Sequence, residues 1–420
     1  MTGSSRHHPR RKRLVGFGYF KRLGPGLITG ASDDDPSGIG TYSQVGAAFR
    51  FGLLWTALLC LPLASAVQEV AARLGLVTGK GLAALIRVKF PRVVLYGAVS
   101  LVVGANVFNI GADLGSMAAA TQLLLPIPYV PSLIAITAIV LALEVFVSYQ
   151  RYAKILRWLT ISLVSYIVVL FIVRVDWREV VHATFLPNLR TDRSYIAALI
   201  AVFGTTISPY LFFWQSSEEV EEEHSRGDVV DRQHLRAMRV DVVSGMVSAV
   251  VVMFAIQVAA AATLGAHGAT TIQSADQAAR ALEPLAGRLA SLLFAAGIVG
   301  TGALAVPVLA GSTAYALSEA FRWREGLWRT FRTAPGFYGV IAGSMCVGIA
   351  LGFFGLNPIR ALYFSAIMNG LAAPPLILLM LILANSKAIM GHRTSDPASN
   401  LFMGLAFLIM AGLPIAYLVR

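Results

Sequence analysis

The chain has 420 residues, of which 56% are hydrophobic and only 13% are charged, and its mean hydropathy is +0.69. This composition excludes a large soluble domain and predicts an all-α protein that crosses a membrane many times. The net charge of +12 would suit a nucleic-acid partner, but the distribution of the basic residues along the chain argues against one.

Apolar stretches recur along the chain, each close to the ~20 residues that an α-helix needs to cross a bilayer. We predict a basic cytoplasmic tail at residues 1–24 and a single transmembrane domain at residues 25–420, with about eleven spanning helices. The expected spans are 26–47, 52–72, 93–123, 130–149, 155–175, 195–216, 240–264, 286–318, 337–355, 360–385 and 399–419.

The basic residues alternate between the two sides of the membrane. If the N-terminus is cytoplasmic, about three quarters of the 34 Lys and Arg residues lie inside, as the positive-inside rule requires. We therefore expect a multi-pass protein of the cell membrane, in a bacterium the inner membrane, that contacts the lipid bilayer and binds no nucleic acid. The expected inside segments are the tail, 73–92, 151–157, 226–239, 322–332 and the two residues Lys387 and Arg393.

Three consecutive acids, Asp33, Asp34 and Asp35, interrupt the first span and are followed by Pro36 and Gly38. A carboxylate in hydrocarbon costs several kcal/mol, so an acid within the membrane is by default a functional-site hypothesis. Proline and glycine break the helix, and a broken helix is tolerated only against protein or a wet cavity. An acid beside a break at mid-membrane predicts a cation-binding site in a transporter.

The sixth span contains a second break, in which Gly204 is followed by Ser208 and Pro209. With five spans between the two breaks, the first and sixth spans run in opposite directions. Broken helices at corresponding places in two halves indicate inverted repeats, here about 25–175 and 195–385, with an extra helix at about 399–419. The alternative is an ordinary proline kink at Pro209.

Two further stretches carry a family resemblance: residues 68–82, which read QEVAARLGLVTGKGL, and residues 111–114, which read GADL. Together with the two breaks, they make the chain from Gly24 to about Arg420 resemble the NRAMP family of divalent-metal transporters. The resemblance implies a LeuT-like fold of two inverted five-helix repeats, in which helices one and six are broken. It also implies a divalent metal substrate held between those helices.

The resemblance assigns roles to individual positions of this sequence. Asp35 matches the metal-binding aspartate of the family, and Thr205 matches the residue that offers a backbone carbonyl. Ser208 stands where the family has a metal-binding methionine, and Gly38 stands where it has an asparagine. Asp34 is then a further or alternating ligand, whereas Asp33 lines the entrance.

The two departures from the family pattern bear on the choice of metal. A thioether favours softer transition metals, whereas a hydroxyl, extra carboxylates and room for water suit Mg²⁺, which dehydrates reluctantly. The expectation is a carrier of the NRAMP-related magnesium transporter branch that works by alternating access, favours Mg²⁺ and also accepts Mn²⁺. The alternatives are a proton-coupled importer of manganese or iron, and a carrier of organic substrates with the same fold. The acid cluster disfavours the last, because it would repel a substrate carboxylate.

Proton coupling is expected to be weak or absent, because most of the titratable groups of the family's proton route are replaced here. Asp113 remains, but Ser116 and Asn106 stand where the family has glutamates, and Tyr210 stands where it has a histidine. Asp113, Asn106 and Tyr210 are the candidate residues for an ion pathway or a proton route. Asp113 is either a structural carboxylate within the bundle or, in the importer alternative, a proton carrier together with Asp35.

Other polar residues in the spans suggest contacts between helices. Asn109, Asn369 and Gln257 are interpreted as interhelical hydrogen-bonding residues in preference to pathway residues. Glu69 is expected to pair with Arg73, one helical turn later. Glu144 is expected to pair with Arg151 or Lys154. The sequence contains no nucleotide-binding loop, catalytic triad or Cys–His cluster, so we expect neither an enzyme nor a bound cofactor.

Overall fold

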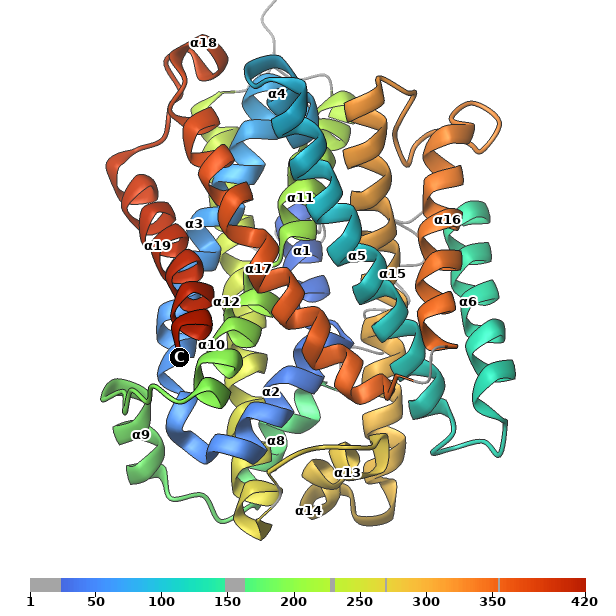
Figure 1. Cartoon of the computed structure of the whole chain (residues 1–420), viewed down its shortest axis with the longest axis vertical. Helices are drawn as coiled ribbons and strands as arrows, with labels where there is room; N and C mark the ends of the chain where they lie inside the picture. Colours follow the sequence, from blue (N-terminus) through green and yellow to red (C-terminus); the bar gives the residue numbers. More distant parts are fainter. Residues whose placement is uncertain (1–23, 148–162, 227–230, 269, 354–355) are drawn as a thin grey trace, which may run out of the picture.

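The computed structural model describes residues 24–147, 163–226, 231–268, 270–353 and 356–420, and these residues form one helical bundle (Figure 1). Within the described residues, eight helical segments are long and apolar enough to cross a membrane. The predicted all-α fold of a multi-pass membrane protein is confirmed. The fifth expected span is described only in part, because residues 148–162 lie outside the described ranges.

The helices of the first half are α1 (Pro25–Asp33), α2 (Pro36–Phe49), α3 (Trp55–Thr78), α4 (Leu82–Lys89), α5 (Arg92–Thr121), α6 (Tyr129–Phe146), α8 (Val164–Ile172) and α9 (Trp177–Phe185). Those of the second half are α10 (Arg193–Thr206), α11 (Pro209–Arg226), α12 (Arg232–Thr263), α13 (Ala275–Ala279), α14 (Glu283–Ala286), α15 (Ala290–Phe321), α16 (Pro335–Gly352), α17 (Pro358–Ala384), α18 (Lys387–Met390) and α19 (Pro397–Val419). Short α4 and α18 lie at one end of the bundle, and α9, α13 and α14 lie at the other (Figure 1).

Both predicted helix breaks are present. The first span is divided into α1 and α2, and the sixth into α10 and α11; a proline is the first residue of α2 and of α11. Proline suits this position because its missing N–H would have no partner in the first turn of a helix, while its ring cannot be accommodated farther inside. The breaks therefore follow from local sequence.

Glycines allow the broken helices to approach their neighbours closely. A Cβ atom on Gly30 of α1 would lie 2.4 Å from the carbonyl oxygen of Gly245 on α12. A Cβ atom on Gly204 of α10 would lie 2.4 Å from the backbone nitrogen of Gly370 on α17. Small residues at both contacts let the backbones touch, as is usual between membrane helices. The two half-helices that lead into the breaks are thus fixed against long helices.

The stretch at residues 68–82 has a structural explanation. Gly79 ends α3 with a φ of +62°, a left-handed conformation that glycine adopts at no steric cost. The carboxylate of Glu319 on α15 accepts a hydrogen bond from the backbone nitrogen of Ala84 at 2.9 Å, in the first turn of α4. A Cβ atom on Gly81 would collide with this carboxylate. Gly79 therefore ends α3, and Gly81 allows α4 to dock against α15.

Candidate functional site

The break between α1 and α2 exposes no carboxylate to bulk solvent. Asp33, Asp34 and Asp35 are 1%, 4% and 1% exposed, although they stand between two helix ends in the centre of the bundle. Asp34 leaves the helical conformation with φ −83° and ψ 46°, and Asp35 is extended with φ −67° and ψ 171°. Burial of three adjacent acids is costly unless each finds a donor, a proton or a cation.

Asp35 is held by hydrogen bonds on both of its oxygens. Its Oδ1 accepts from the backbone nitrogen of Gly38 and from the hydroxyl of Ser37, each at 2.7 Å, so Asp35 is the N-cap of α2. Its Oδ2 accepts from Nδ2 of Asn109 on α5 at 3.2 Å. Gly38 thus contributes a backbone N–H to the carboxylate, and as a glycine it has no side chain with which to ligate a metal.

Asp33 and Asp34 lack such donors. Among the described residues, neither oxygen of Asp33 has a hydrogen-bond partner, and Oδ1 of Asp34 also has none, although all three atoms are buried. No three His, Cys, Asp or Glu side chains in the described ranges converge with the spacing of a metal site. The three aspartates therefore do not surround one point, and a cation at the break would need oxygen ligands from elsewhere.

The end of α10 lies against the α1/α2 break. The hydroxyl oxygens of Thr205 and Ser37 are 3.2 Å apart, and those of Thr206 and Tyr42 are 3.0 Å apart. From the beginning of α11, the hydroxyl of Tyr210 donates to the carbonyl of Ser32 at 2.8 Å. These contacts join the two broken helices, as the sequence predicted.

Ser208 folds back onto the end of α10. Its hydroxyl lies 2.9 Å from the carbonyl oxygen of Gly204 and 2.7 Å from that of Thr205, to which it donates. The carbonyl that was expected to face a metal is thus engaged by the neighbouring side chain. The hydroxyl oxygen of Ser208 keeps its lone pairs and remains an oxygen donor for a ligand.

Asp113 is linked to Asp35 through one amide. Nδ2 of Asn109 donates to Oδ2 of Asp113 at 2.9 Å as well as to Asp35, and its Oδ1 accepts from Nδ2 of Asn369 on α17 at 2.9 Å. Asn109 and Asn369 do bridge helices, as predicted, but the contact between Asn109 and Asp35 was missed. The available signal was the spacing of Asn109 and Asp113, which places both side chains on one face of α5.

Asn106 lies one turn before Asn109, and its amide is turned away from the break. Its Nδ2 contacts the hydroxyls of Ser312 and Thr313 on α15 at 2.8 and 2.9 Å, and the carbonyl of Leu309 at 3.3 Å. The structure thus places the expected pathway residue Asn106 in the contact between α5 and α15. Ser116 donates to the backbone carbonyl of Asp113 and not to its carboxylate.

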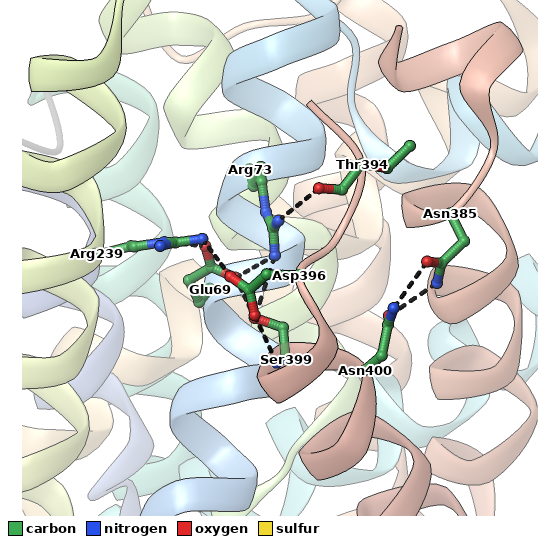
Figure 2. Close-up of polar contacts among 8 residues, drawn as sticks. All are labelled: Glu69, Arg73, Arg239, Asn385, Thr394, Asp396, Ser399 and Asn400. Carbon is green, nitrogen blue, oxygen red and sulfur yellow. Dashed lines mark hydrogen bonds and ion pairs between the residues drawn. The ribbon is translucent and has the colours of Figure 1, made fainter. Parts of the chain in front are cut away.

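A partly buried ion-pair cluster lies near one end of α3 (Figure 2). The predicted pair of Glu69 and Arg73 is confirmed, with Oε2 and Nη2 2.6 Å apart. Arg239 of α12 adds a second contact to Glu69 at 2.7 Å and reaches Asp396, the N-cap of α19, at 2.7 Å. For Glu144, both carboxylate oxygens are buried without a partner among the described residues, and its expected partners Arg151 and Lys154 lie outside them.

Comparisons with known proteins give one consistent result. A family model described as natural resistance-associated macrophage protein-like, or Nramp, matches residues 26–420. The divalent metal cation transporter MntH of Aeromonas hydrophila is 29% identical over 410 residues, which cover 94% of this chain and 95% of that protein. MntH of Caldanaerobacter subterraneus is 24% identical over 394 residues, covering 91% and 89%.

Solved structures agree on the fold. A manganese transporter of Eremococcus coleocola superposes with a TM-score of 0.74 at 20% identity, covering 96% of this chain and 87% of that one. Mhp1, a nucleobase-cation-symport-1 family transporter, gives 0.59 at 14% identity, covering 95% and 91%. These similarities confirm the predicted LeuT-like fold with broken first and sixth helices.

Proposed function

Because the chain belongs to the Nramp family, we propose that it carries a divalent metal cation across the membrane by alternating access. The observation that carries the proposal is the helix break at Asp34 and Asp35, where buried carboxylate oxygens lie between two broken helices. Asp33 and Asp34 supply negative charge that no donor among the described residues offsets. A divalent cation would offset it, whereas an organic anion would be repelled.

Asp35 is the proposed principal ligand, through the oxygen that faces α5. The C-terminal end of α1 forms one side of the break and the C-terminal end of α10 contacts α2 beside it, so both helix ends would present partial negative charge to a cation. Further oxygen donors are the hydroxyl of Ser208, the second lone pair of the Thr205 carbonyl, and the unpartnered oxygen of Asp34. All of these atoms are hard ligands, which suit Mg²⁺ and Mn²⁺ alike.

The solved structure from Eremococcus coleocola is a manganese transporter, and this favours manganese over the magnesium that the sequence placed first. Manganese is itself an oxygen-preferring ion, so a site without a thioether is compatible with it. Magnesium stays the second candidate because Ser208 provides a hydroxyl in place of the family's methionine. Proton coupling through Asp113 and Asp35 belongs to the manganese candidate.

Flux through the purified protein in liposomes tests the proposal. We expect saturable Mn²⁺ uptake, reported by a dye in the lumen, that Asp35→Ala abolishes and that Asp276→Ala, at an exposed position of α13, leaves intact. Competition by excess Mg²⁺ would support magnesium as a substrate, and acidification of the lumen during uptake would support proton coupling. If Asp35→Ala transports Mn²⁺ and Mg²⁺ at the wild-type rate, the proposed site is wrong. If the wild-type protein transports neither Mn²⁺ nor Mg²⁺, the proposed function is wrong.

A further inference from the structure

The carboxylate of Asp35 is oriented from two directions. Its Oδ1 accepts two hydrogen bonds from within its own helix α2, from Ser37 and Gly38. Its Oδ2 accepts a single bond from the described residues, the one from Asn109 of α5. The bonds from Ser37 and Gly38 hold Oδ1 in place, and the bond from Asn109 opposes a rotation of the carboxylate group that would move Oδ2.

The amide of Asn109 is itself held in one orientation. Nδ2 of Asn369 donates to Oδ1 of Asn109 at 2.9 Å, which turns the oxygen of Asn109 toward α17 and its NH₂ group toward the acids. The two N–H groups then serve Asp35 at 3.2 Å and Asp113 at 2.9 Å. The three side chains linked by these hydrogen bonds are fully buried: Asn369, Asn109 and Asp113. Every donor and acceptor atom of the Asn109 amide is therefore engaged.

We propose that Asn109 is the positioning residue of the cation site, an inference that rests on the function proposed above. It donates to the ligating oxygen of Asp35 and leaves that oxygen's remaining lone pair for the ion. Because Asn109 presents its NH₂ group to Asp35 and turns its oxygen toward Asn369, Asn109 acts through Asp35 and does not ligate the ion. Hydrogen bonds to a ligating carboxylate commonly change metal affinity by roughly 10- to 100-fold.

Asn109 also separates the two acids of the bundle. It places a neutral donor between Asp35 and Asp113, so that both carboxylates share one amide. An apolar residue here would leave Oδ2 of both carboxylates buried with one donor fewer. These hydrogen bonds run from Asn369 on α17 through Asn109 on α5 to Asp35 at the start of α2, and thereby connect the proposed binding site to the long helices α5 and α17.

The test is the Mn²⁺ dissociation constant of the purified protein, measured by calorimetry. Asn109→Leu, which keeps the branched shape and removes the donors, should raise the Kd about 10- to 100-fold. In liposomes it should raise the KM for Mn²⁺ by a similar factor, with a smaller change in the maximal rate. Asn106→Leu is the matched control, because it removes a buried amide of the same helix whose bonds go to α15. It should change thermal stability but leave the Kd within about twofold of wild type.

A second variant guards against a folding defect at Asn109. Asn369→Leu leaves Asn109 and the acids in place and removes only the bond that orients the amide, so it should raise the Kd less than Asn109→Leu does. In the double variant the two effects should not add, because both act through one amide. A wild-type Kd in folded Asn109→Leu, or additive effects in the double variant, would overturn the inference. Absence of Mn²⁺ and Mg²⁺ binding by the wild type would instead overturn the proposed function.

Discussion

The three aspartates at the first break occupy different chemical positions although they are adjacent in sequence. Asp35 caps a helix and accepts three hydrogen bonds, whereas Asp33 accepts none from the described residues. The reason is the proline after Asp35, which starts α2 and brings the free N–H of Gly38 to the carboxylate. Asp33 is the last residue of α1, where the backbone offers carbonyls and no free N–H.

A further acid outside the spans gives a pH prediction. Glu325 lies in the connection between α15 and α16 and lines a cavity of about 340 Å³ together with Glu319 and Arg87. Burial, and to a lesser degree the charge of Glu319, raise the pKa of Glu325 from about 4.5 to about 8. Its Oε2 is buried with no hydrogen-bond partner among the described residues.

A raised carboxyl pKa favours the folded state at low pH and costs stability as the pH rises. The unfolded chain releases the proton near pH 4.5 and the folded chain only near pH 8, so the stability contribution is lost across this interval. Glu325→Gln should therefore raise the melting temperature relative to wild type at pH 9 and leave it nearly unchanged below pH 4.5. An equal change at both values, measured by scanning fluorimetry in detergent, would contradict this assignment.

Between elements, the ion-pair cluster of Figure 2 joins α3, α12 and the beginning of α19. Arg73 is almost wholly buried, with 4% of its side chain exposed, and it also reaches the carbonyl of Thr394 at 3.3 Å. Arg239 is 47% exposed. Arg73 therefore stabilises the charge of Glu69 more than Arg239 does, because water can solvate the exposed Arg239 and weaken its ion pair.

Two matched substitutions rank these contributions. Arg73→Met should lower the free energy of unfolding by roughly 3–5 kcal/mol, because it deprives a buried carboxylate of its main partner. Arg239→Met should cost only about 0–1 kcal/mol, as expected for an exposed ion pair. Denaturant unfolding in detergent micelles measures both values. A larger loss for Arg239→Met would show that α19 depends on the exposed pair.

Some of these contacts were accessible from sequence and others were not. Glu69 and Arg73 are four residues apart on one helix, so their pairing follows from helical periodicity. Arg239 and Asp396 come from distant parts of the chain, and nothing in the local sequence of either residue indicates the other. The same holds for Asn109 and Asn369, whose contact depends on how α5 packs against α17.

For the molecule as a whole, the expected orientation places α4 and α18 in the cytoplasm and α9 outside (Figure 1). The basic residues of the expected inside segments, among them Lys80, Arg87 and Lys387, support this assignment through the positive-inside rule. Arg420 donates to the carbonyl of Thr191, in the connection between α9 and α10, at 3.4 Å, so the expected orientation places Arg420 on the same outer side as α9.

Thiol labelling of intact cells tests the orientation. Thr191 and His392 are both exposed, and each can be replaced by cysteine in a Cys346→Ser background that removes the exposed native thiol. A membrane-impermeant maleimide should label Thr191→Cys directly and His392→Cys only after permeabilisation. The reverse pattern would place the N-terminus outside and invert the direction assigned to the bundle.

The sequence by itself determined the membrane class and the two helix breaks, because hydropathy and proline geometry are local effects. Only the tertiary structure decided which atoms surround Asp35. Asn106 faces α15, and Asn109 reaches the carboxylate. These orientations depend on how α5 packs against α2, α15 and α17, and residues far apart in sequence carry no local signal of such contacts.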